Sequence, residues 1–186
     1  MQYPDMEAEQ LKEALSRKFC LPKTYFLPGN GASELFLGIL HALKPKKVIL
    51  PVPSFYGYAY TAKAVGSEVV CVPLKKEEDF LPGEEFVLAL QEDAELLFLA
   101  NPNNPTGKLM KPAYLENVLE VCKEKNIYVV LDECFIEFCE EEKSIVQKLS
   151  TYRNLLIVRA FTKIYAIPGV RLGYLMCSDK ELLLKI

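Results

Sequence analysis

Apolar positions along the chain follow helical spacing in some segments and form short continuous runs in others. Residues 7–19 carry apolar side chains at helical spacing, so we expect an exposed amphipathic helix there. Residues 21–34 are rich in proline and glycine and predict a loop. Residues 34–43 are strongly apolar and predict a second helix.

From residue 47 onward, strand-like runs alternate with helix-like segments. Continuous runs such as LLFLA and IYVVL, without strict alternation, are typical of strands covered on both faces. We therefore expect an α/β fold with a mainly parallel sheet flanked by helices. The expected strands are 47–50, 68–73, 95–100, 127–131, 155–160 and 172–177, and the expected helices between them are 58–65, 84–91 and 112–125.

The segments that follow the predicted strands have unusual sequences. In sheets of this kind, ligands bind beyond the carboxyl ends of the strands, where the connecting loops converge. We therefore look for a functional site in these loops. They are VPSFYGY after the first strand, NPNNPTG after the third, DECFIEF after the fourth and RAFTKIYAIPGVR after the fifth.

The composition describes a soluble globular protein. Its 186 residues are 51% apolar, with a formal net charge of -3 and a mean hydropathy of +0.09. The slight acidity argues against a nucleic-acid binder, which would need a basic stripe. The chain has no apolar stretch of the ~20 residues that span a bilayer and no signal-peptide pattern at its start, so we expect no membrane partner and a cytoplasmic location. The acidic run 140–142 is interpreted as a solvated surface.

Cysteine and histidine offer little material for a metal site. The six cysteines form no C-x-x-C pair and His41 is the single histidine, so we predict no metal and no Ser-His or Cys-His triad. Most cysteines have apolar neighbours, as Cys71 and Cys177 do, which favours buried reduced thiols. His41 lies in an apolar segment and is interpreted as a helix-surface or core histidine.

Two motifs at predicted strand ends carry polar groups. In residues 101–107, two prolines fix the backbone and a glycine closes the turn, which predicts a rigid loop that contains Asn104. Asp132 follows the buried strand IYVVL, where an ionised carboxylate is costly without a cationic or hydrogen-bonding partner. We therefore expect Asp132 to have such a partner, although a helix cap or a strand-end surface group is the alternative interpretation.

Lys163 is the third candidate site residue, after Asn104 and Asp132. It lies between apolar and aromatic neighbours, and a lysine in a partly desolvated site becomes a usable amine nucleophile for Schiff-base chemistry. Arg171 and the backbone amides of residues 31–33, at the start of a helix, are groups that hold a phosphate. Together they describe a phosphorylated aldehyde cofactor with a basic ring nitrogen. In isolation, Lys163 would be a surface lysine and Arg171 a partner for an acid.

These motifs resemble the fold-type I pyridoxal-phosphate enzymes of aminotransferase class I/II. The matching stretches are YPD at 3–5, GNGASE at 29–34, PSFYGY at 53–58, NPNNPTG, DECFIEF and TKIYAIPGVRLGY. They occur in family order and cover most of the chain. The chain looks most like the branch that holds histidinol-phosphate aminotransferase and threonine-phosphate decarboxylase, and TKIYAIPG leans toward the latter.

The resemblance implies a role for each site residue. Lys163 would form a Schiff base with pyridoxal 5'-phosphate and then move a proton, and Asp132 would pair with the pyridinium nitrogen. Asn104 would hydrogen-bond the phenolic oxygen, and Phe55 would stack on the ring, with Tyr56 and Tyr58 as open alternatives. The phosphate would be bound by Gly31, Ala32, Ser33, Thr162 and Arg171. The G-x-G turn at 29–31 also occurs in nucleotide-binding proteins, but the G-x-G-x-x-G fingerprint is incomplete here.

The sequence departs from the family pattern in residue type and in length. Phe135 stands where many relatives have a tyrosine that bonds the phenolic oxygen, and Ala160 replaces a common hydroxyl residue. Family members are roughly twice as long, so we expect a fragment or truncated gene product. Its division would be an N-terminal helix (1–20) and the cofactor-binding large domain (21–186), with the C-terminal small domain absent.

Two functions from different classes therefore remain. The first is a pyridoxal-phosphate enzyme that acts on a small-molecule amino acid, phosphorylated or not, by transamination or decarboxylation. The second is a non-catalytic cofactor-binding domain, since the small domain carries the arginine that binds the substrate carboxylate. Relatives form homodimers, so the resemblance also implies self-association.

Overall fold

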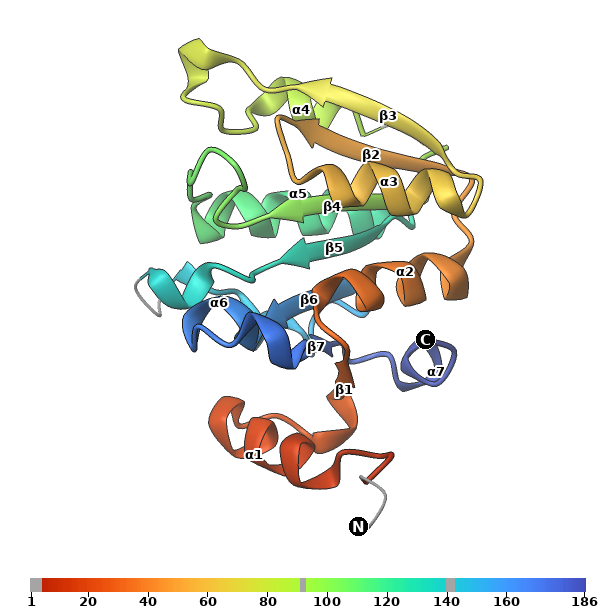
Figure 1. Cartoon of the computed structure of the whole chain (residues 1–186). Coiled ribbons are helices and arrows are strands. Elements are labelled where there is room, and N and C mark those ends of the chain that lie inside the picture. Colours follow the sequence, from red (N-terminus) through yellow and green to blue (C-terminus); the bar gives the residue numbers. More distant parts are fainter. Residues whose placement is uncertain (1–4, 91–92, 140–142) are drawn as a thin grey trace.

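A seven-stranded sheet forms the centre of the computed structural model, which describes residues 5–90, 93–139 and 143–186 (Figure 1). The strand order is β1-β7-β6-β5-β4-β2-β3. Strands β3, β2, β4, β5 and β6 run parallel, whereas β7 is antiparallel to both β6 and β1. The expected mainly parallel α/β sheet is therefore confirmed. The strands are β1 (Phe26–Gly29), β2 (Lys47–Val52), β3 (Glu68–Pro73), β4 (Leu96–Ala100), β5 (Tyr128–Asp132), β6 (Leu155–Ala160) and β7 (Gly173–Met176).

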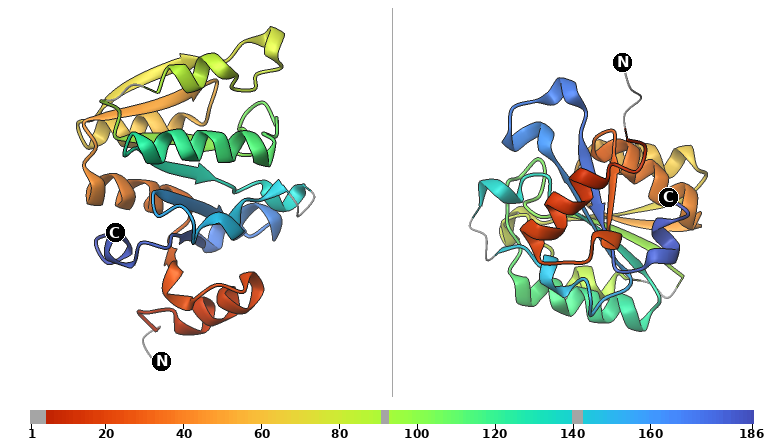
Figure 2. Two further views of the ribbon diagram at one scale, coloured as in Figure 1. Left: turned by 180° about the vertical axis from the view of Figure 1, so that it is seen from behind. Right: turned by 90° about the horizontal axis from the view of Figure 1, so that it is seen from below.

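Helices cover both faces of the sheet, as the views from the front and from behind show (Figures 1 and 2). On one face α2, α3 and α7 bury apolar side chains against alternate strand residues, and on the other face α1, α4 and α5 do so. The central strands β4 and β6 are buried along their whole length, which explains their continuous apolar runs. The helices are α1 (Glu9–Phe19), α2 (Ala32–Leu43), α3 (Tyr56–Ala64), α4 (Glu84–Leu88), α5 (Pro112–Glu124), α6 (Phe161–Ile164) and α7 (Lys180–Leu183).

The loop predicted over residues 21–34 was wrong in its middle. Phe26–Gly29 is the strand β1, which pairs with β7, and a short 3-10 helix, Lys23–Tyr25, precedes it. The strand is only four residues long and contains Pro28 and Gly29, so its sequence shows no strand periodicity. Both residues are tolerated because β1 is an edge strand. The following helix begins at Ala32, two residues before the predicted start.

The other predicted elements are present. Many of their ends are shifted by one or two residues from the predicted positions. Strands 68–73 and 155–160 have the predicted bounds. The helix predicted over 84–91 ends at Leu88, and position 91 lies outside the described residues. The acidic run 140–142 and positions 3 and 4 of the YPD motif also lie outside them.

The cysteines differ from the expectation of buried thiols. Cys122 and Cys177 are buried, but Cys20 and Cys71 are exposed, so the prediction was wrong for these two. Cys71 is exposed because it lies on β3, the edge strand, whose residues are only partly covered. His41 lies exposed on the surface of α2, one of the two positions expected for it.

Two kinds of feature are absent from the described ranges of the chain. No helix within them has the length and the apolar character to cross a bilayer. The same ranges hold no group of three or more His, Cys, Asp or Glu side chains placed to bind a metal ion.

Candidate functional site

A cavity of about 140 Å³ lies at the carboxyl ends of β5 and β6. It brings together loops that are far apart in the sequence, because parallel strands deliver their following loops to the same edge of the sheet. Exposed residues at its rim, such as Ser33 and Lys163, open it to solvent. The lining includes eight of the nine residues predicted for the site, namely Ala32, Ser33, Phe55, Asn104, Asp132, Thr162, Lys163 and Arg171.

Gly31, the ninth residue, lies directly behind this lining. Its φ of 78° is a left-handed conformation that favours glycine, and a Cβ there would lie 2.7 Å from Nη2 of Arg171. Among the described residues, no side chain caps α2, so the amides of Ala32 and Ser33 remain available at its first turn. The guanidinium and the helix N-terminus together form a place for an anionic group such as a phosphate.

Asp132 is the last residue of β5, and its carboxylate is held from two sides. The Tyr58 hydroxyl donates to Oδ2 at 2.5 Å, and the Cys134 backbone N–H donates to Oδ1 at 2.9 Å. Burial raises the pKa of Asp132 above its ordinary value, and these two hydrogen bonds oppose the rise. A cationic group placed beside this carboxylate would favour its ionised form.

Tyr58 has a role that the sequence did not reveal. The sequence leaves it as one of three candidate rings for stacking on a cofactor, but it is only 1% exposed and its ring stacks on Phe98 at a centroid distance of 4.9 Å. Tyr56, another of the three, is 78% exposed. Phe55 is the ring of the three that lines the cavity. Nothing in the sequence pairs Tyr58 with Asp132, 74 positions later.

Phe55 folds back over the first turn of α3. A Cβ at Gly57 would lie 2.3 Å from the Phe55 ring, so the absence of a side chain at Gly57 permits this ring position. The ring also meets Tyr58 edge-on, at a centroid distance of 5.4 Å and an interplanar angle of 79°. The local sequence therefore fixes where Phe55 faces the cavity.

Lys163 lies in α6, the single helical turn that follows β6, next to the buried Thr162. The sequence argument expected a partly desolvated lysine, and that expectation was wrong for this structure: Lys163 is exposed. The chain turns away from the sheet at the carboxyl end of β6, which leaves the lysine at the rim of the cavity. Burial raises the pKa of the neighbouring Cys134 well above its ordinary value, Asp132 adds to the rise, and the Lys163 ammonium opposes it.

The three asparagines of the NPNNPTG loop have different contacts. Asn101 accepts a hydrogen bond from the Met110 backbone N–H at 2.7 Å, which closes the loop. Asn103 donates to the Pro53 carbonyl at 3.1 Å and so ties this loop to the one that carries Phe55. Asn104, the remaining member, lines the cavity.

A family model described as aminotransferase class I and II matches residues 1–185. The chain belongs to this family. It is 40% identical over 177 residues to a histidinol-phosphate aminotransferase of Symbiobacterium thermophilum, an alignment that covers 92% of this chain and 47% of that protein. It is 36% identical over 177 residues to a threonine-phosphate decarboxylase of Salmonella typhimurium, which covers 95% of this chain and 49% of the relative.

The fold also matches solved structures of class I/II aminotransferases. The crystal structure of histidinol-phosphate aminotransferase from Clostridium acetobutylicum superposes with a TM-score of 0.90 at 32% identity, over 99% of this chain and 54% of that one. The predicted large-domain architecture of these enzymes is therefore confirmed. The chain spans about half the length of the curated relatives that it matches. Relatives in this family use pyridoxal 5'-phosphate as their cofactor.

Two positions where this chain departs from the class I/II pattern also line the cavity. Phe135 and Ala160 both face it, and neither carries a hydroxyl group. The neutral polar side chains of the lining are therefore those of Ser33, Asn104 and Thr162, and position 135 contributes no tyrosine hydroxyl.

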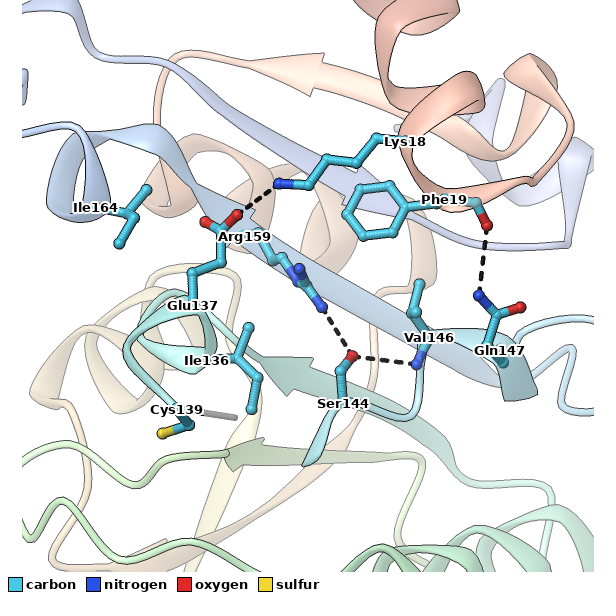
Figure 3. Close-up of a pocket in the computed structure, with 10 residues that line it drawn as sticks. All are labelled: Lys18, Phe19, Ile136, Glu137, Cys139, Ser144, Val146, Gln147, Arg159 and Ile164. Carbon is cyan, nitrogen blue, oxygen red and sulfur yellow. Dashed lines mark hydrogen bonds and ion pairs between the residues drawn. The ribbon is translucent and has the colours of Figure 1, made fainter. Parts of the chain in front are cut away.

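A larger cavity of about 600 Å³ lies elsewhere in this aminotransferase fold, between the end of α1, α6 and the segment after β5 (Figure 3). It contains none of the nine predicted residues. Arg159 reaches into it and donates through Nη2 to Ser144 at 2.7 Å and to Glu133 Oε2 at 2.8 Å. Because these charged groups already satisfy one another, we interpret the network as structural. Sequence reasoning missed this pair, because Glu133 and Arg159 are 26 positions apart and no motif links them.

Proposed function

We propose that this chain is the pyridoxal-phosphate-binding part of an enzyme that acts on an amino acid. The observation that carries the proposal is the single cavity that gathers a lysine, a carboxylate and an anion-binding helix start from separate loops. Family membership supports pyridoxal phosphate as the group that this set of residues holds. Bound there, the cofactor supplies an aldehyde for covalent attachment and a cationic ring that accepts electrons.

The residues of the cavity fit this cofactor in chemical type. Gly31 leaves room for the Arg171 guanidinium beside the α2 amides, which suits the phosphate. Asp132, held by two donors, suits a protonated ring nitrogen. We assign Asn104 to the phenolic oxygen and Phe55 to the ring face. Thr162 would add a hydroxyl contact to the phosphate.

Lys163 is the residue that we assign to catalysis, together with Asp132. Its Nζ would attach the cofactor and, once released by the substrate amine, would take a proton from the substrate Cα and return it. The exposed position of Lys163 at the rim leaves its Nζ within reach of a substrate that enters from solvent.

We propose transamination of a phosphorylated amino compound as the reaction. The names of the relatives support the substrate class, since both contain a phosphate ester. Decarboxylation is the second candidate, because the Salmonella typhimurium relative is named as a decarboxylase. The proposed homodimer, the division at residue 20 and a cytoplasmic location remain predictions.

An absorbance spectrum with added pyridoxal phosphate tests the proposal. We expect a visible band in the wild-type chain that Lys163→Ala lacks. Borohydride reduction should remove this band and attach the cofactor stably to Lys163, where peptide mass spectrometry locates it. Lys108→Ala is the matched control, because Lys108 follows the NPNNPTG loop but lies outside the cavity lining. Absence of the band in the wild-type chain would refute cofactor binding by this chain and favour a non-catalytic domain.

The reaction is tested on the loaded protein with threonine phosphate and histidinol phosphate. Release of carbon dioxide would identify decarboxylation, whereas formation of a new amino acid from an added 2-oxo acid would identify transamination. A loaded protein that does neither would leave cofactor binding without catalysis.

A further inference from the structure

The hydroxyl of Tyr58 is the strongest unexplained polar feature near the cavity. The residue is 1% exposed, and its ring is fixed by stacking on Phe98 and by an edge contact with Phe36. Packing alone would be satisfied by a phenylalanine. The hydroxyl instead donates a hydrogen bond to Oδ2 of Asp132, at 2.5 Å.

We propose that Tyr58 is a positioning residue for cofactor chemistry, whose hydroxyl fixes the Asp132 carboxylate in the orientation and charge state that pair with a cationic ring nitrogen. This inference rests on the proposed function. Tyr58 itself lies behind Asp132 and does not line the cavity, so it acts through the carboxylate.

The geometry supports an orienting role because the carboxylate is gripped at both oxygens. Tyr58 donates to Oδ2 and the Cys134 backbone N–H donates to Oδ1, so rotation of the group would break both hydrogen bonds. Tyr58 also lies three residues after Phe55 at the start of α3, and their rings touch edge-on. One helix turn therefore supports both the carboxylate and the ring that faces the cavity.

The electrostatics point in the same direction. Burial raises the pKa of Asp132, and the hydrogen bonds from Cys134 and Tyr58 lower it. Burial and the nearby Asp132 charge raise the pKa of Tyr58 well above its ordinary value, so the hydroxyl keeps its proton and remains a donor. The other titratable groups that face the cavity are the Cys134 thiol, Lys163 and Arg171. Without the Tyr58 hydroxyl, burial has less opposition and a neutral Asp132 becomes more populated.

Tyr58→Phe tests the inference, because it removes one oxygen and keeps the ring. Tyr60→Phe is the matched control: it lies on the same helix, is 71% exposed and has the same chemistry. The first readout uses the cofactor-free protein. The Asp132 carboxyl is titrated by ¹³C NMR and assigned with Asp132→Asn, and we expect it to titrate at higher pH in Tyr58→Phe than in the wild type or in Tyr60→Phe.

The second readout is pyridoxal-phosphate binding followed by absorbance across pH. A hydrogen bond to a charged group corresponds to roughly tenfold or more in a binding constant, so we expect binding to weaken by about that factor in Tyr58→Phe alone. We also expect the pH at which the absorbance band changes to shift in this variant. Purely structural packing would leave the band unchanged.

The outcomes separate this inference from the proposed function. If Asp132 titration and cofactor binding in Tyr58→Phe match those of the wild type and of Tyr60→Phe, Tyr58 is a packing residue and the inference is overturned. If the wild-type chain binds no pyridoxal phosphate, the proposed function fails, and an unchanged cofactor-free titration would overturn the inference as well. If Tyr58→Phe does not fold, the Tyr58 Cζ shift in the wild type decides: it must follow the Asp132 titration.

Discussion

The buried ion pair between Glu133 and Arg159 allows a quantitative prediction about stability. The side chains are 0% and 6% exposed, and Arg159 donates through Nε and Nη2 to Glu133 Oε2 at 3.0 Å and 2.8 Å. Glu133→Gln keeps the shape of the side chain and removes its charge. The guanidinium then stays buried and charged, because arginine cannot lose its proton in a protein.

The expected loss is a large part of the stability of the fold. Removing one partner of a buried pair costs about 3–5 kcal/mol, whereas a whole protein is stable by about 5–15 kcal/mol. For a chain of this size each kcal/mol corresponds to roughly 2–4 °C in melting temperature, so Glu133→Gln should lower it by roughly 6–20 °C.

Removing the other partner of the pair, Arg159, should make the stability loss depend on pH. In Arg159→Met the buried carboxyl of Glu133 can take up a proton, and burial raises its pKa in the folded state. A group with a raised folded pKa contributes stability below its unfolded pKa, and that contribution is lost as pH rises through the folded pKa. Arg159→Met should therefore be more stable near pH 4.5 than near pH 7.5, relative to the wild type.

The assay is urea unfolding of the two single variants and of the double variant. The double variant removes both charges, so its loss should be smaller than the sum of the single losses. The partly exposed pair Lys148–Glu116 is the control, and its coupling should be much smaller. Single losses that add without coupling, or an Arg159→Met variant whose relative stability does not change with pH, would refute the reasoning.

Three further predictions concern the site. Gly173→Ala would place a Cβ 2.9 Å from the Gly31 carbonyl carbon, so it should cost about 1–3 kcal/mol in urea unfolding and weaken cofactor binding; unchanged binding would contradict the contact. Gly57→Ala should displace the Phe55 ring and weaken binding in an absorbance titration, while the melting temperature stays within a few degrees. Asp132→Asn should raise the melting temperature of the cofactor-free protein at pH 7 but not at pH 3, since burial raises the folded pKa of Asp132, and should abolish the visible band.

The sequence pattern predicts most of this fold because its sheet is buried. Runs such as LLFLA mark central strands directly, since both faces of β4 are covered. The four-residue strand β1 escaped prediction because its pairing with β7 is formed across nearly 150 positions, and its own residues carry no strand period. Exposure of Cys71 was missed for a related reason: apolar neighbours do not reveal that a strand lies at the edge.

The site was predictable where chemistry follows a strand end. Asp132 ends β5, and Lys163 lies in α6, the turn that follows β6, so their place at the carboxyl ends of neighbouring parallel strands follows from the topology. The exposure of Lys163 could not be predicted, because it depends on how α6 leaves the sheet. The partners Tyr58 of Asp132 and Arg159 of Glu133 come from other elements, and only the folded structure brings them together.

Asp132 and Glu133 are consecutive residues that serve opposite faces of the same sheet. Asp132 meets the site cavity, and Glu133 meets Arg159, one position before Ala160 of the cavity lining. A slip of β6 against β5 by one residue would exchange these faces, turning Arg159 toward the cavity and leaving Glu133 buried without its cation. The ion pair therefore favours the correct register of β5 and β6. A chain that pairs these strands out of register leaves a buried charge without its partner, and only the correct register assembles the site.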